Sequence, residues 1–203
     1  MKKTEFAVLI SLVITVIFSS FVGIEKQCEN INENVVRLHI IAENDTEKAQ
    51  EIKLKVRDKL LENSKELFSG ATDKQTALLK INENLGKIEE ICEQTLLENN
   101  CDSEVTVGVE KMFFNLKNYE TFVMPSGIYD ALKITIGDGG GKNWWCVMFP
   151  PMCLSACVDR ETLTQTLGED GGDFIEKTPK YVARFKILEY IEKLFTKAPK
   201  YEK

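Results

Sequence analysis

Residues 35–58, VVRLHIIAENDTEKAQEIKLKVRD, decide the fold class because the sequence pattern changes within them. The first eight residues, 35–42, are rich in β-branched side chains and predict a strand. The residues that follow predict an amphipathic helix that runs to about Phe68, and Asn44 with Glu47 resembles its capping signal. The apolar stripe of this helix consists of Ala49, Ile52, Val56 and Leu60.

After this stretch the apolar residues first recur with helical spacing and then at every second position. A second helix is predicted from about Thr72 to Asn99, and the period of two begins near Val105. The buried face of that helix is Leu78, Ile81, Leu85, Ile88 and Cys92. Short strands are expected at 105–110, 121–124, 132–136 and 143–149, with turns at 115–119 and 125–127. This order predicts an α+β domain with an antiparallel or mixed sheet and helices packed on one face.

The N-terminus has the pattern of an export signal. Residues 6–24 carry no charge, and Lys2 and Lys3 precede them. No small-residue cleavage site follows, so an uncleaved membrane anchor is the close alternative. We therefore expect membrane contact only through residues 6–24. The expected organisation is an export signal or anchor at 1–24, a linker at 25–34, an α+β core at 35–157, a polar loop at 158–179 and a C-terminal helix packing on the core at 180–198.

Composition excludes several classes of function. The chain has 203 residues, with 26 basic and 32 acidic side chains and a net charge of −6, which argues against a nucleic-acid binder. The single histidine excludes sites that need several histidines, such as HExxH zinc hydrolases. We therefore expect no metal, no cofactor and no nucleic-acid partner.

The cysteines leave the redox state open. The six are Cys28, Cys92, Cys101, Cys146, Cys153 and Cys157. In an exported protein a turn at Pro150-Pro151 would let Cys153 fold back towards Cys146 and form a disulfide. A thiol nucleophile at Cys146 or Cys153 would need His39 within hydrogen-bond reach as its base, which a sequence does not reveal. The glycines at 137–141 are followed by strand-like sequence, so they predict a hairpin loop and not a phosphate cradle.

The most distinctive stretch is NWWCVMFPPMC at 143–153. On a strand the adjacent Trp144 and Trp145 must face opposite sides of the sheet. An exposed tryptophan beside Phe149 and Pro150 would be an anchor for a protein partner, because such aromatics dominate binding hot spots. The alternative is that both tryptophans pack structurally, with Trp144 under a neighbouring helix.

A second candidate for partner binding is a polar corner where the first strand meets its helix. Arg37, His39, Asn44 and Asp45 belong to it. The two candidate surfaces are both inferences from the residues of this chain.

Several of these motifs resemble a known family. The stretches GDGGGKNWWCVMFPPMC at 137–153 and VRLHIIAENDTEKAQEIKLKVRD at 36–58 resemble stage II sporulation protein R of endospore-forming bacteria. Residues 124–137, MPSGIYDALKITIG, and 182–195, VARFKILEYIEKLF, support the resemblance, which spans most of 35–195.

The resemblance implies a secreted signalling protein and not an enzyme. Such proteins are made in the forespore and exported into the space between forespore and mother cell. There they trigger a membrane aspartic protease of the mother cell, which removes the pro-sequence of a sigma factor. The alternatives are an exported thiol-dependent enzyme using Cys146 or Cys153 and a membrane-anchored extracytoplasmic binding domain.

Overall fold

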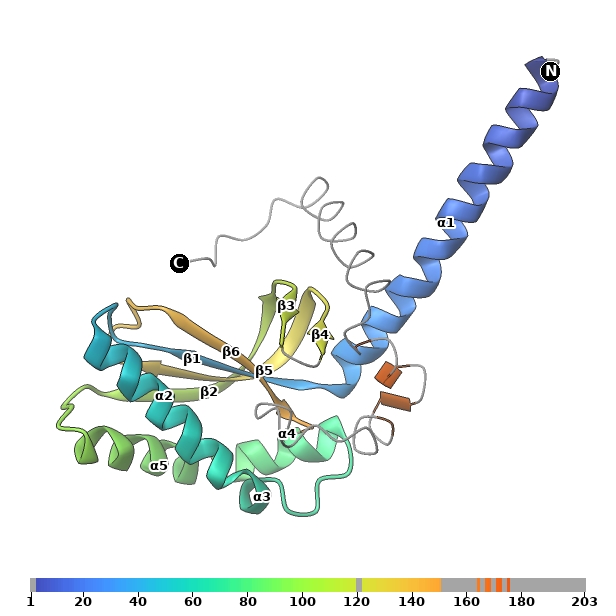
Figure 1. Ribbon diagram of the computed structural model, residues 1–203. Helices are drawn as coiled ribbons and strands as arrows, with labels where there is room; N and C mark the ends of the chain where they lie inside the picture. Colours follow the sequence, from blue (N-terminus) through green and yellow to red (C-terminus); the bar gives the residue numbers. More distant parts are fainter. Residues whose placement is uncertain are drawn as a thin grey trace.

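A computed structural model describes residues 3–119 and 122–150, together with Thr164, Leu167, Gly168, Gly171, Gly172 and Ile175. The chain is α+β, as predicted (Figure 1). The helices are α1 (Lys3–Asn34), α2 (Glu47–Glu62), α3 (Ser64–Leu67), α4 (Lys74–Glu83) and α5 (Leu85–Glu98). The strands are β1 (Val36–Ile41), β2 (Val105–Phe114), β3 (Lys117–Asn118), β4 (Val123–Met124), β5 (Gly127–Ile136) and β6 (Asn143–Phe149).

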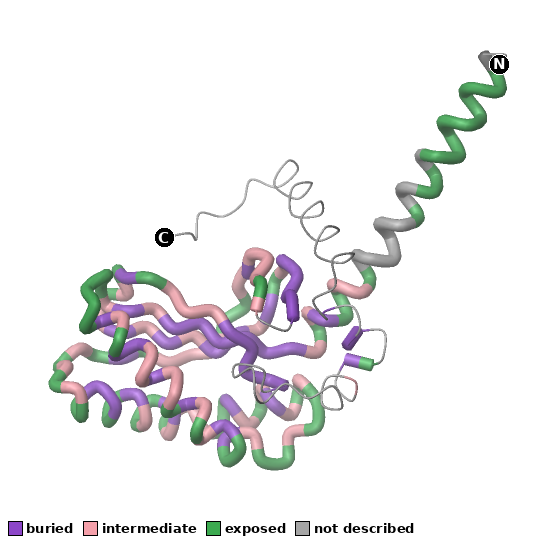
Figure 2. The backbone as a smooth tube through the Cα atoms, viewed as in Figure 1, coloured by how far each residue is buried: buried purple, intermediate pink, exposed green. Residues whose placement is uncertain are grey.

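The main sheet is mixed and has the strand order β2-β5-β1-β6. β1 pairs in parallel with β5, with Leu38 opposite Leu132, and antiparallel with β6, with Leu38 opposite Cys146. β2 and β5 form a long antiparallel pair. The β-branched, apolar β1 lies inside the sheet, and Figure 2 shows it buried along most of its length. Of the two sheet types that the sequence allowed, the mixed one is correct.

Helices α2, α4 and α5 cover one face of this sheet, as predicted (Figure 1). Alternate residues of each strand point to them, and these join the apolar stripes of the helices in one core. The strand members of that core are Val36, Leu38, Ile40, Val105, Leu132, Ile134, Ile136, Cys146, Met148 and Phe149. The helices contribute Ile52, Val56, Leu60, Ala77, Ile81, Ile88, Cys92 and Leu96. We call this the helix-side face.

The ends of the helices differ from the prediction. Thr46, not Asn44, is the N-cap of α2, because its hydroxyl accepts from the amide of Ala49, and Asn44 instead accepts from Thr46. The second expected helix begins with a capping box at Asp73. Both expected helices are interrupted by an asparagine that serves as a cap on both sides, Asn63 and Asn84. Asparagine competes for backbone hydrogen bonds and therefore favours such breaks.

Two strands are longer than predicted and the turn region contains a small hairpin. β2 continues to Phe114 and β5 begins at Gly127, so the pair spans ten residues on each strand. The expected turn at 115–119 contains β3, which pairs with β4. Within the expected return strand at 121–124, β4 covers Val123–Met124, and residue 121 lies outside the described residues.

The N-terminal and C-terminal segments differ from the expected organisation where the structure describes them. Residues 25–34 are not a linker, because α1 continues to Asn34 and its Ile31 is fully buried. Among the residues that could be searched, no helix is long and apolar enough to cross a membrane. The described residues between 164 and 175 are helical, and Leu167 and Ile175 are buried, so they do not fit a polar loop. Residues 180–198 lie outside the described residues.

Candidate functional site

The sheet face opposite the helices is only partly covered, and we call it the open face. It carries the remaining alternate residues of the strands, namely Arg37, His39, Ile41, Thr106, Gly108, Glu110, Met112, Phe114, Tyr129, Ala131, Lys133, Thr135, Asn143, Trp145 and Val147. The β3–β4 hairpin and the end of α1 cover one end of it (Figure 1). At the other end several residues, including Thr106 and Glu110, are exposed.

The adjacent tryptophans lie on opposite faces, as strand geometry requires. Trp144 joins the helix-side face, where the Arg57 guanidinium of α2 lies 4.4 Å from the centre of its ring. Trp145 lies on the open face, where its ring stacks on His39 at 3.9 Å with an interplanar angle of 6°. Both indoles are half-buried. Trp144 therefore has the position under a neighbouring helix that the structural alternative predicts, and Trp145 is the one presented on the open face.

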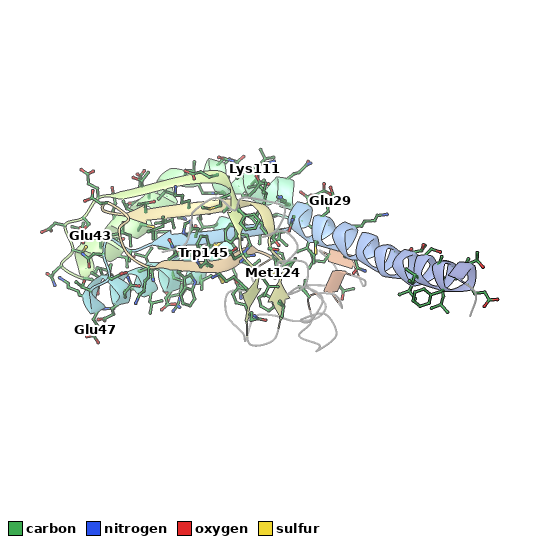
Figure 3. The ribbon with its side chains drawn as sticks, turned by 90° about the horizontal axis from the view of Figure 1, so that it is seen from above. Glu29, Glu43, Glu47, Lys111, Met124 and Trp145 are labelled. Atoms are coloured by element: carbon green, nitrogen blue, oxygen red, sulfur yellow. The ribbon has the colours of Figure 1, made fainter. Side chains whose placement is uncertain are left out.

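Trp145 is surrounded by a cluster of rings and one cation. The ring of Phe114 meets it edge-on at 4.9 Å, and the Lys117 Nζ lies 5.7 Å from its centre. In Figure 3, which looks onto the open face, Trp145 lies next to the hairpin that carries Met124. An aromatic surface of this kind suits recognition of a protein segment.

Arg37 fastens the hairpin to β6 from beneath this cluster. It is fully buried, its Nε donates to the Cys146 carbonyl at 2.8 Å, and its Nη2 donates to the Tyr119 hydroxyl at 3.0 Å. That hydroxyl in turn donates to the Trp145 carbonyl at 3.1 Å. Burial raises the pKa of Tyr119, so the hydroxyl keeps its proton for this bond.

The guanidinium of Arg37 packs against aromatic rings and not against a carboxylate. Its guanidinium lies 4.4 Å from the ring centre of Phe114 and 5.0 Å from that of Tyr129. Among the described residues it forms no ion pair, and its Nη1 has no hydrogen-bond partner. A guanidinium does not lose its proton in proteins, so a positive charge remains beneath the open face.

His39 is neutral in this structure. It is 4 % exposed, and burial lowers its pKa from 6.5 to about 4. The amide oxygen of Asn143 lies 2.8 Å from Nε2 and accepts only, so Nε2 carries the proton and Nδ1 does not. The imidazole therefore serves as a flat support for the Trp145 ring.

The predicted polar corner is not formed as one site. Arg37 and His39 are buried on the open face, whereas Asn44 and Asp45 are exposed at the start of α2. The Asp45 carboxylate accepts from the amide of Lys142 at 2.8 Å and so holds the glycine loop. The two pairs are separated because residues 37 and 39 lie within β1, where side chains stand perpendicular to the sheet, whereas residues 44 and 45 follow the end of the strand.

Phe149 and Pro150 are not surface anchors in this structure. Both are buried, and the Phe149 ring packs 6.1 Å from the ring of Phe68. A register shift in the β1–β6 pairing between Val36 and Arg37 breaks the alternation. As a result Phe149 joins the helix-side face together with its neighbour Met148.

The glycine loop at 137–141 is held close to the corner. Gly141 donates to the Ala42 carbonyl at 2.9 Å, and a Cβ on Gly141 would collide with the backbone of Asn44. Gly137 has a positive φ of 55°, which glycine adopts without strain. Glycine is therefore required at these positions for a tight turn that packs against residues 42–44.

Cys146 does not meet the requirements of a thiol nucleophile, which needs a free thiol with His39 as its base. Cys146 is disulfide-bonded and points to the helix-side face, whereas His39 points to the open face. A disulfide sulfur is not a thiolate nucleophile. Cys153, the expected partner of this disulfide, lies outside the described residues, so the pairing stays a prediction. Within the described residues, no group of three or more His, Cys, Asp or Glu side chains is placed to hold a metal ion.

Comparison with known proteins places the chain in a family. The model of the family described as Stage II sporulation protein R matches residues 32–159, which is more than half of the chain. The chain belongs to the stage II sporulation protein R family. Stage II sporulation protein R of Bacillus subtilis (strain 168) is 33% identical over 164 residues, which cover 76% of this chain and 72% of the relative. No solved structure matches the chain.

In this member of the stage II sporulation protein R family, the site includes residues that sequence reasoning missed. Phe114, Lys117 and Tyr119 form the wall around Trp145, and all three lie in or next to a stretch interpreted as a turn. The alternation beginning at Val105 continues to Phe114, and following it further would have placed that ring on the open face.

Proposed function

We propose that this protein is an exported signalling protein that activates a membrane-embedded aspartic protease and so triggers processing of a pro-sigma factor during sporulation. Membership of the stage II sporulation protein R family carries this proposal, because it supports a role in sporulation. The uncharged run at 6–24 behind two lysines supports export across the forespore membrane into the space facing the mother cell.

The protease is proposed to contact the open face around Trp145. A half-buried tryptophan in a cluster of aromatic rings has the composition of a binding hot spot. Arg37 and His39 act there as positioning residues, because they hold the Trp145 strand and ring from below. Trp144 and Phe149 support the strand from the helix-side face.

Activation requires that the ligand prefer one state of the protease. A shift from an inactive majority to an active majority needs about 5.5 kcal/mol of differential binding. One or two hot spots in a compact interface supply free energies of this size. No catalytic step by this chain is needed.

The test is reconstitution in a host without sporulation genes. The protein, its cognate membrane aspartic protease and the sigma-factor precursor are co-expressed, and the precursor size is followed by immunoblot. Precursor processing should require the export signal, since a form lacking 1–24 stays on the wrong side of the membrane. An intact precursor, with all three proteins present and folded, would contradict the proposal.

Cysteine variants separate the ligand from a thiol enzyme. Cys153→Ser should reduce processing only as far as it lowers the amount of folded protein, whereas an enzyme that uses this thiol would lose activity at full folded yield. A membrane-anchored binding domain would in turn leave the precursor unprocessed whether or not it is exported.

A further inference from the structure

The open face differs in charge from the rest of the molecule. The whole chain has a net charge of −6. The described side chains of the open face and its hairpin wall include three cations, Arg37, Lys117 and Lys133, and one carboxylate, Glu110. That carboxylate is already engaged, because Lys133 Nζ lies 3.1 Å from Glu110.

Two of these cations have no carboxylate partner among the described residues. Lys117 is half-buried on β3, and its described interaction is with the Trp145 ring. Arg37 is fully buried over aromatic rings. A charge surrounded by apolar rings is poorly screened, so its field extends to the surface above it.

We propose that the Trp145 surface, namely Trp145 with Lys117 above the buried Arg37, binds an acidic segment of a partner protein. A carboxylate of that segment pairs with the Lys117 ammonium, and an adjacent apolar side chain packs on the exposed part of the Trp145 ring. This inference rests on the proposed function, because it names the chemistry of the contact through which the protease would be engaged.

Charge complementarity selects the acidic segment over a neutral or basic one. A basic segment would meet the positive field of Arg37 and Lys117, and like charges across an interface cost free energy. The net charge of the chain is −6, so a locally positive patch also directs an acidic segment towards Trp145.

The first test measures affinity with a matched charge control. The probe is the cognate protease in detergent micelles, and binding is followed by biolayer interferometry with the immobilised chain. Lys117→Glu should weaken binding at least about tenfold, and Lys117→Arg should preserve it. Lys65→Glu changes the net charge equally at an exposed position of α3 and should have less than about a twofold effect. Equal effects of Lys117→Glu and Lys65→Glu would overturn the inference.

The second test identifies what touches the surface. A photocrosslinking amino acid replaces Ile41, which is half-buried on the open face two residues from His39, the residue that stacks on Trp145, in sporulating cells of an endospore former. Crosslinking to an acidic segment of the protease supports both proposals. Crosslinking to the protease through a neutral or basic segment, or to a phospholipid or glycan, overturns this inference.

The two proposals fail in different ways. If an acidic segment of another protein is crosslinked, and Lys117→Glu abolishes that crosslink while Lys65→Glu does not, the acidic-segment inference stands and the proposed protease partner is refuted. If the protease binds Lys117→Glu as well as it binds the unchanged chain, the protease remains the partner and the acidic contact is refuted.

Discussion

The helix-side face and the open face are built from alternating residues of the same four strands, yet their chemistry is different. The helix-side face is continuous and apolar from Val105 to Met148. The open face buries Arg37 and His39 and carries the ion pair of Lys133 with the exposed Glu110. Buried polar groups cost stability unless each finds partners. The packed helices account for the fold, whereas the open face retains costly polar groups that orient Trp145, the partner contact that we propose.

The largest expected difference between the faces is in stability. Leu38→Ala removes a fully buried side chain from the helix-side face and should lower the free energy of unfolding by about 3 kcal/mol. Ile41→Ala, on the same strand but half-buried on the open face, should lower it by about 1 kcal/mol. Urea denaturation of the two variants measures both values. Equal losses would contradict the division between the faces.

A smaller effect is expected from the titration of His39, the single histidine of the chain. Burial holds its pKa at about 4 in the folded state against 6.5 when unperturbed. Between pH 4 and pH 6.5 the unfolded chain binds more protons than the folded one. His39 therefore contributes stability above about pH 6.5, and this contribution is lost as the pH falls towards 4. From about pH 7 to about pH 5 the loss should be about 2 kcal/mol.

The variant His39→Phe isolates this contribution because it keeps a ring under Trp145 and removes the titrating group. Its free energy of unfolding should fall less steeply with pH than that of the unchanged chain, by about the same 2 kcal/mol. Parallel pH profiles for the two proteins would show that His39 does not stay neutral on the open face.

Much of the helix-side face could be predicted from the sequence. Periodicity reports which residues avoid water, and the stripe Ala49, Ile52, Val56 and Leu60 is buried as expected. Helix breaks at Asn63 and Asn84 were missed, because a single asparagine inside an apolar periodicity is a weak local signal.

The open face could be predicted less well. The opposition of Trp144 and Trp145 follows from strand geometry alone and is confirmed. The roles of Arg37 and Tyr119 depend on contacts across 82 residues of sequence, which no local pattern reports. The position of Phe149 was predicted wrongly because a register shift between two paired strands has no signal in the sequence of either strand.

The most direct test of the account compares Trp145→Ala with Trp144→Ala in the reconstituted processing assay, at matched amounts of folded, exported protein. The account predicts that Trp145→Ala lowers precursor processing at least about tenfold, because a binding hot spot is lost. Trp144→Ala should lower the free energy of unfolding and leave processing per folded molecule within about twofold of the unchanged chain. Equal processing by the two variants, or a greater loss with Trp144→Ala, would contradict the assignment of signalling to the open face.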